Sequence, residues 1–211
     1  MSTPFGEITK LILMEKEKSK FDYMNADMAY DLLSDLIITG ATVDFYQCKK
    51  DLNNYTPYSE TRDILSINGE QSELRVTKSK NIKENIIILN INGFEVSDFN
   101  YEILEDEIKI NHNFKENDEV EVIQCFEGEF EENLNHREKY IIALAAYMHY
   151  SNQLINDEEL LRTQIGDKDY SRTSNANMLK TLISLKSTLD EKLEKYINQY
   201  VYSNISSEDL M

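Results

Sequence analysis

The sequence contains no long apolar run, and this absence excludes a membrane-spanning helix. Such a helix needs roughly 20 consecutive apolar residues, and no stretch of this chain approaches that length. The opening residues, MSTPFGEITKLILMEKEK, also lack the basic segment that precedes the apolar core of a secretory signal peptide. We therefore expect a protein that folds in the cytoplasm and does not contact a membrane.

Cysteine, histidine and glycine are too few or too scattered to form a recognisable site. Cys48 and Cys125 are the only two cysteines, and isolated cysteines in a cytoplasmic protein are most often reduced and structural. His112, His136 and His149 have no cysteine or carboxylate at a metal-ligand spacing. The six glycines form neither GxxxxGK[ST] nor GxGxxG, which bind nucleotide phosphates. We expect no metal and no cofactor.

Neighbouring acidic residues are the remaining candidates for chemistry, and we expect them to be surface charge. Adjacent acids on a helix point in different directions, and one group lies in a predicted turn. No serine stands in a nucleophile-elbow motif, and Cys48 has no nearby histidine. We therefore predict no catalytic residue and no enzyme. The acidic groups are Glu105-Asp106-Glu107, Glu131-Glu132 and Glu158-Glu159.

Basic residues are scarce, with 22 against 39 acidic residues and a formal net charge of −17. The excess lies mostly in residues 57–134, which hold 19 acidic and 7 basic side chains. A surface of this sign repels phosphate, and Lys49-Lys50 offers too little basic surface to bind nucleic acid. The acidic surface either keeps the protein soluble or meets a basic partner, and the sequence leaves both open.

Strand patterns fill the middle of the chain, from Glu84 to Phe126. Ile86–Ile91 is an apolar, β-branched run, and Asn92-Gly93 separates it from Phe94–Val96. Asn-Gly between such runs is a strong hairpin signal, since both central residues of a type I′ turn need positive φ. We expect three to five antiparallel strands. Further strand signals are Ile64–Ile67 and Leu74–Val76 around Asn68-Gly69, Tyr101 and Ile103 before the turn at Glu105-Asp106, Ile108 and Ile110 after it, and Val120 with Val122.

Apolar residues at helical spacing predict helices on both sides of this segment. Asn25 is placed to cap the second helix, and Gly40 to end it. Asn156, followed by three acidic residues, is placed to cap a separate short helix. The expected helices cover residues 4–18, 26–38, 135–150, 156–164 and 174–200.

The last of these helices has a stripe of apolar residues along one face. Their mean spacing is about 3.7 residues, which predicts a continuous packing surface. Such a surface packs within one subunit or between subunits, and in either case we expect Leu185 and Leu189 to be buried. The stripe consists of Met178, Leu182, Leu185, Leu189, Leu193, Tyr196 and Tyr200.

Together these patterns predict an α+β fold in which a helical body is interrupted by a small antiparallel β module. The helical body comprises residues 1–57 and 131–204 and includes a long C-terminal helix. The β module covers residues 58–130, where the period changes from 3.6 to two residues and back. Residues 205–211 form a polar tail.

Two segments are similar to a known family. They are DLIITGATVDFYQCKKDL (Asp35–Leu52) and DKDYSRTSNANMLKTLISLKSTLDEKLEKYINQYVYSN (Asp167–Asn204). They resemble the small head–tail connector proteins, also called neck or head-completion adaptor proteins, of tailed bacteriophages. Members of that family pair a short amphipathic helix and a Lys-Asp-Leu segment with a closing helix ending in Tyr-x-Tyr. The strands in Ile87–Val96 and Asn117–Val122 are also similar to small β modules of virion proteins.

The resemblance implies a structural protein of the virion, assembled in the host cytoplasm and located in the neck. There it implies a homo-oligomeric ring of about twelve copies between the portal and the tail. The implied partners are the portal protein and a tail or second connector protein, with DNA passing through the ring. Two alternatives are a soluble acidic binding module or assembly factor that is not retained in the virion, and a tail or baseplate component.

Overall fold

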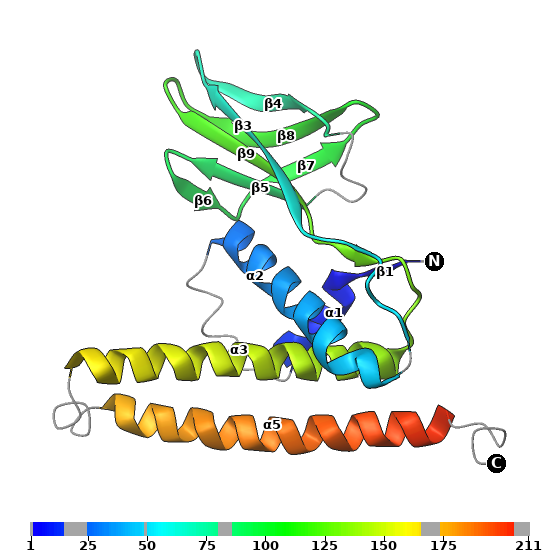
Figure 1. Cartoon of the computed structure of the whole chain (residues 1–211). Helices are drawn as coiled ribbons and strands as arrows, with labels where there is room; N and C mark the ends of the chain where they lie inside the picture. The colour runs from blue at the N-terminus through cyan, green and yellow to red at the C-terminus, as the bar shows by residue number, and fades with distance from the viewer. Residues whose placement is uncertain (1, 15–24, 49, 80–85, 166–173, 205–211) are drawn as a thin grey trace. The chain divides into compact units, whose positions relative to one another are not determined.

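The computed structural model describes residues 2–14, 25–48, 50–79, 86–165 and 174–204 (Figure 1). The chain divides into two compact units, and it crosses between them three times within the first third of the sequence. The helical unit consists of Met1–Glu17, Leu33–Thr56 and Glu129–Met211, and the β unit consists of Lys18–Leu32 and Pro57–Gly128. The boundaries at 57/58 and 130/131 remain a prediction, because a division by contacts does not show which segments fold independently.

Helix α3 (His136–Ile165) is the centre of the helical unit. It contacts α1 (Phe5–Met14), α5 (Ser174–Asn204) and the π-helical turn η2 (Gly40–Asp44). Figure 1 shows α3 and α5 running antiparallel, side by side. Because neighbours surround α3, every residue from Ile141 to Ala146 is buried, and the helix has no continuous polar face there.

Helix α3 corrects the expectation of two separate helices at 135–150 and 156–164. Asn156 lies inside α3 and does not begin a helix. The reason is tertiary packing: Ile155, directly before Asn156, clusters with Leu179 and Leu182 of α5, and this contact holds α3 against its neighbour at the point where the new helix was expected to begin. Packing of this kind overrides local capping preferences.

Helix α5 confirms the predicted long C-terminal helix and part of its apolar stripe. Leu182, Leu189 and Leu193 are buried, as predicted. Leu185 is only half-buried, and the expectation of its burial is wrong. The buried face is rotated towards Leu179 and Ile197, which the predicted stripe omits.

Gly40 follows α2 (Ala26–Thr39) and does not terminate the helical path as predicted. The chain continues through η2 into the 3₁₀ helix η3 (Phe45–Cys48). A Cβ at Gly40 would lie 2.9 Å from the Ala146 nitrogen and 3.0 Å from the Ala145 Cβ. Gly40 is therefore required for close approach to α3, and not for a left-handed cap.

A small antiparallel sheet completes the helical unit, in the order β1 (Thr3–Pro4), β10 (Glu129–Phe130), β2 (Tyr55–Thr56). Thr56 pairs directly with Glu129. The chain therefore leaves this sheet after Thr56 and returns to the adjacent position. The Phe130 ring packs against that of Phe5, with centroids 4.8 Å apart, and anchors the sheet to α1.

Two antiparallel sheets face each other across an apolar core in the β unit. One sheet has the order β3-β9-β5-β6 and the other has the order β4-β8-β7. Their shared core combines Leu89, Ile108, Ile110, Val120 and Val122, all essentially inaccessible to solvent. The strands are β3 (Ser59–Ser66), β4 (Gln71–Thr77), β5 (Ile86–Ile91), β6 (Phe94–Val96), β7 (Asn100–Ile103), β8 (Glu107–Phe114) and β9 (Glu119–Phe126).

The two Asn-Gly dipeptides have different outcomes. Asn92 and Gly93 have φ values of 53° and 81° and join the paired strands β5 and β6, which confirms the predicted hairpin. Asn68-Gly69 does not join paired strands, because β3 pairs with β9 and β4 pairs with β8. The turn instead carries the chain from one sheet to the other, and the predicted hairpin there is wrong.

The expected fold class, a helical body interrupted by a small β module, is wrong. The described residues form four α-helices and ten strands in three antiparallel sheets, a β-rich α+β fold. The expectation of three to five strands counted local hairpin signals. The strand signals at Ile64–Ile67 and at Val120 with Val122 overlap β3 and β9, but local signals do not predict that these two strands pair across a long sequence separation. In the part of the chain that the structure describes, no helix is long and apolar enough to cross a bilayer.

Candidate functional site

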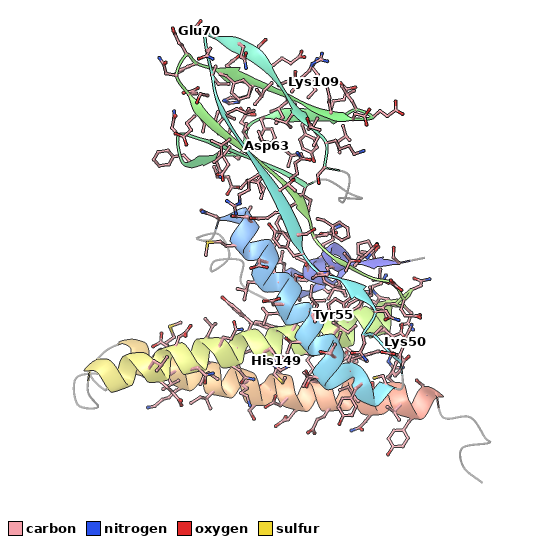
Figure 2. The ribbon with its side chains drawn as sticks, turned by 45° about the horizontal axis from the view of Figure 1, so that its top comes forward. Lys50, Tyr55, Asp63, Glu70, Lys109 and His149 are labelled. Carbon is pink, nitrogen blue, oxygen red and sulfur yellow. The ribbon has the colours of Figure 1, made fainter. Side chains whose placement is uncertain are left out.

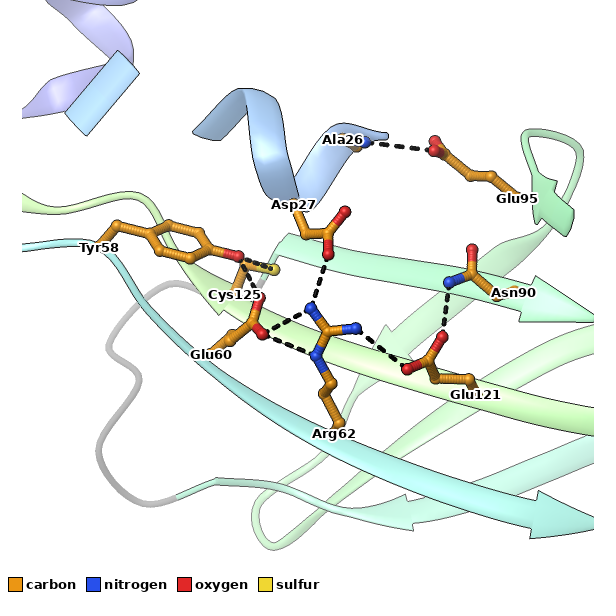
Figure 3. A network of polar contacts seen from close by, with 9 residues as sticks. All are labelled: Ala26, Asp27, Tyr58, Glu60, Arg62, Asn90, Glu95, Glu121 and Cys125. Atoms are coloured by element: carbon orange, nitrogen blue, oxygen red, sulfur yellow. Dashed lines mark hydrogen bonds and ion pairs between the residues drawn. The ribbon is translucent and has the colours of Figure 1, made fainter. Parts of the chain in front are cut away.

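An ion-pair network around Arg62 holds the start of α2 to the β unit (Figure 3). The Arg62 guanidinium donates to Asp27 at 2.6 Å, to Glu60 at 2.6 Å and to Glu121 at 3.1 Å. The second oxygen of Glu121 accepts a hydrogen bond from the Asn90 amide at 2.7 Å. One cation therefore serves three carboxylates that come from a helix and two strands.

The same contact has an apolar layer on the outer face of the larger sheet. Ile88, Ile123 and Cys125 are buried there, with Ala26 and Tyr58 packed against them. Glu95 accepts a hydrogen bond from the Ala26 nitrogen at 3.3 Å, at the beginning of α2. The network therefore holds the first turn of α2 against the sheet, which gives Arg62 a structural role.

Tyr58 and Cys125 connect the polar network to this apolar layer. The Tyr58 hydroxyl donates to Glu60 at 2.6 Å and lies 3.3 Å from the Cys125 sulfur. Burial raises the pKa of the Cys125 thiol to about 11, although the hydrogen bond with Tyr58 opposes the shift. A thiol with such a pKa is protonated near neutral pH and is a weak nucleophile.

Glu138 is the main polar centre of the helical unit, and its side chain is only 4% exposed. It accepts hydrogen bonds from Lys50 at 3.1 Å, from the Tyr200 hydroxyl at 2.6 Å and from the Asn135 nitrogen at 2.7 Å. Asn135 in turn accepts from the Glu138 nitrogen, which completes a capping box at the start of α3. Through these bonds Glu138 joins the start of α3 to Lys50 and Tyr200, which are distant in the sequence.

A groove with a volume of about 540 Å³ lies between α5 and the η2 turn of the helical unit. It is lined by the carboxylates Asp44, Asp190 and Glu194 and by apolar side chains that include Leu193. Asp44 lies 2.7 Å from the His149 Nε2 on α3, and Figure 2 labels that histidine. Asp190 pairs with Lys186 at 3.2 Å.

The structure separates the candidate residues that the sequence offered. His112 contacts the Asp98 carbonyl at 3.2 Å, His136 is exposed at the first position of α3, and His149 pairs with Asp44. In the described ranges no three metal-ligating side chains come together. Cys48 and Cys125 are free, buried thiols in different units.

The acidic groups also lie apart. Glu105-Asp106 forms the exposed turn between β7 and β8, Glu131-Glu132 follows β10, and Glu158-Glu159 lies on α3. Lys50 is engaged with Glu138, and Lys49 falls outside the described residues. The Glu138 capping box could have been found from its Asn-x-x-Glu spacing. The Arg62 network could not, since its members are up to 94 positions apart (Asp27 to Glu121).

Comparison of the chain with protein-family models, curated proteins and solved structures gives no match. A functional proposal therefore depends on the geometry of the described residues. This geometry consists of polar centres that hold elements together, buried unreactive thiols, and open surfaces that are acidic or apolar.

Proposed function

We propose that the protein is a non-enzymatic structural component of a tailed-phage virion, forming a ring at the neck between portal and tail. The observation that carries the proposal is the packing of its two connector-like segments. Residues of Asp35–Leu52 form η2 and η3, which contact α3 and α5. The Phe45 ring lies 5.9 Å from that of Tyr200, near the Tyr-x-Tyr end of the second segment. The two segments that resemble connector proteins therefore pack against each other in one core.

Exposed apolar side chains on the helical unit support association with other subunits. Val43 and Tyr46 are exposed on consecutive turns beside α3, and Tyr202 is exposed near the end of α5. Obligate interfaces bury apolar side chains of this kind, and a closed ring repeats the same pair of surfaces around its axis. The ring of about twelve copies implied by the resemblance places these side chains between neighbouring subunits.

The proposal is tested on purified virions. Quantitative mass spectrometry should detect the chain at about one copy per portal subunit, because both rings share the neck axis. Symmetry-averaged imaging should place its helical unit in a closed ring at the portal–tail junction. Density at the baseplate would support a tail component instead. Absence of the chain from clean virions would rule out any structural role there.

A second candidate is an assembly factor whose β unit binds a basic partner, and the charge of the β unit favours it. Residues 57–128 contain 16 acidic and 7 basic side chains. Such a factor would be present in infected cells, absent from virions, and monomeric when purified. The virion measurement therefore separates the two functions.

A further inference from the structure

The strand β7 forms one edge of the smaller sheet in the β unit. Among the described strands it pairs with β8 alone. An edge strand presents a row of unpaired backbone N–H and C=O groups to which another strand can be added. The strand β6, which lies three residues earlier, is likewise the edge of the larger sheet. The sandwich is therefore open along the β6–β7 segment.

Apolar side chains of β7 continue the core up to this edge. Tyr101 pairs with Ile110 and Ile103 pairs with Ile108, and both partners are fully buried in the core. Cross-strand partners lie on the same face, so Tyr101 and Ile103 face inward. They are nevertheless 43% and 42% exposed, since none of the described strands lies beyond β7 in the sheet to cover them. The core of the sandwich is thus incompletely closed here.

The charge of the same segment has a single sign. Residues 94–106 contain five acidic and no basic residues. Glu102 faces outward on β7, opposite Lys109, but the Lys109 ammonium pairs with Glu73 at 2.8 Å. Glu105 is exposed in the following turn. A strand added to β7 would therefore meet an apolar face on one side and negative charge on the other.

We propose that the β7 edge binds an extended basic segment of a partner protein, in which lysine or arginine alternates with apolar residues. Main-chain hydrogen bonds to β7 supply affinity, and the alternating side chains supply specificity. The apolar residues of the segment pack beside Tyr101 and Ile103 and complete the core. Its basic residues lie beside Glu102 and Glu105, and opposite charges across neighbouring strands attract. The proposal does not depend on the location of the protein in a virion.

The test uses the full chain and a capped twelve-residue peptide in which lysine alternates with valine and threonine. Backbone amide resonances of Asn100–Ile103 should shift on titration, and the affinity should fall as salt is added. A peptide with glutamate in place of lysine should bind at least tenfold more weakly. Shifts confined to other strands, or no shift at millimolar peptide, would contradict the proposal.

Matched variants separate local charge from net charge. The double variant Glu102→Lys/Glu105→Lys should weaken peptide binding at least tenfold. Glu70→Lys/Glu116→Lys makes the same change in net charge at exposed positions outside 94–106, and should weaken binding less than threefold. If both double variants weaken peptide binding equally, the peptide is attracted by the net charge of the protein and not by the β7 edge, and the proposal is overturned.

A second pair of variants tests the apolar face. Ile103→Lys places a charge on the inward side of the edge and should abolish binding. Ile64→Lys, at a residue 65% exposed on the outer face of β3, should leave binding within threefold. If Ile103→Lys does not fold, peptide mapping on the unaltered chain still decides. Concentration-dependent broadening of the β7 amides without peptide would identify a second copy of this chain as the occupant and overturn the assignment to a basic segment.

Discussion

Individual polar residues in this protein act as connectors between elements. Glu138 joins the start of α3 to Lys50 and to Tyr200 of α5, and Arg62 joins Asp27 of α2 to two strands. The two centres differ in burial, and therefore in the energy they contribute. Glu138 is almost fully buried, whereas the Arg62 side chain is 41% exposed and its ion pairs are screened by solvent. We expect substitutions around Glu138 to have the larger effect on stability.

Tyr200→Phe tests the contribution of the hydrogen bond to Glu138. The change removes only the hydroxyl and leaves a buried carboxylate with one partner fewer. A hydrogen bond to a charged group contributes about 1.5–3 kcal/mol, and we expect a loss of that size in the free energy of unfolding measured with urea. Tyr202→Phe, on the same helix but 74% exposed, is the control and should change stability little. Equal effects of the two changes would show that the Tyr200–Glu138 bond contributes nothing measurable.

The two cysteines should be unreactive in the folded protein. Burial raises the pKa of both thiols, from 9.0 to about 11, and Glu138 adds to the shift at Cys48. At pH 8 only about one thiol in a thousand is then ionised, so a disulfide reagent should label the native chain far more slowly than the urea-unfolded chain. Single Cys48→Ser and Cys125→Ser variants assign each rate. Labelling that is equally fast in the two states would contradict the burial of the thiols.

Because the thiol pKa values are raised in the folded protein, the free energy of unfolding should depend on pH in the alkaline range. The thiols ionise more readily in the unfolded chain than in the folded one, so their contribution is complete below about pH 9 and is lost as the pH rises towards about 11. The free energy of unfolding should therefore decline over that range. The decline should be smaller in the double serine variant, measured in the same buffers.

At the scale of elements, the close contact between η2 and α3 depends on a missing side chain. Gly40→Ala would ordinarily stabilise a helix by about 1 kcal/mol, but the new Cβ would lie 2.9 Å from a backbone nitrogen of α3. Backbone cannot move aside as a flexible side chain does, so we expect a net destabilisation of about 1–3 kcal/mol. Asp35→Ala, at an exposed position of α2, is the control and should leave the melting temperature unchanged or raise it. Stabilisation by Gly40→Ala would show that the two elements separate easily.

Local signals predicted some of these elements and could not predict others. The Asn92-Gly93 hairpin and the long C-terminal helix were predictable, because each is encoded by adjacent residues or by one repeating face. The continuity of α3 was not predictable, since it depends on the contact of Ile155 with α5, which overrides the local preference for a helix cap at Asn156. The division into two sheets was missed for the same reason: β4 pairs with β8, from Thr77–Glu107, 30 positions apart, to Gln71–Phe114, 43 positions apart. Of the polar centres, only the capping box of Glu138 is encoded locally.

For the whole molecule, the important feature is where the chain leaves and re-enters the small sheet of the helical unit. Thr56 and Glu129 are cross-strand partners, so residues 57–128 are inserted at the turn of what would otherwise be the hairpin β2–β10. Thr56 and Glu129, the residues that flank this segment, are adjacent in the sheet. A short turn could therefore join them without a rearrangement of the helical unit. The helical unit has a core that runs from Phe5 and Phe130 to α3 and α5, and we expect it to fold without residues 57–128.

Replacing residues 57–128 with Asn-Gly tests this independence. Asn-Gly favours the type I′ turn of a two-residue hairpin, which matches the direct pairing of Thr56 with Glu129. The shortened chain should keep a cooperative thermal transition and most of its helical circular dichroism. Within α2, residues Ala26–Leu32 belong to the β unit and lose their partners. A matched variant closed with Pro-Pro cannot form this turn, so its transition should occur at a lower temperature. If the Asn-Gly chain loses most of its helical circular dichroism, the helical unit does not fold by itself. Residues 57–128 would then belong to a core that the two units share.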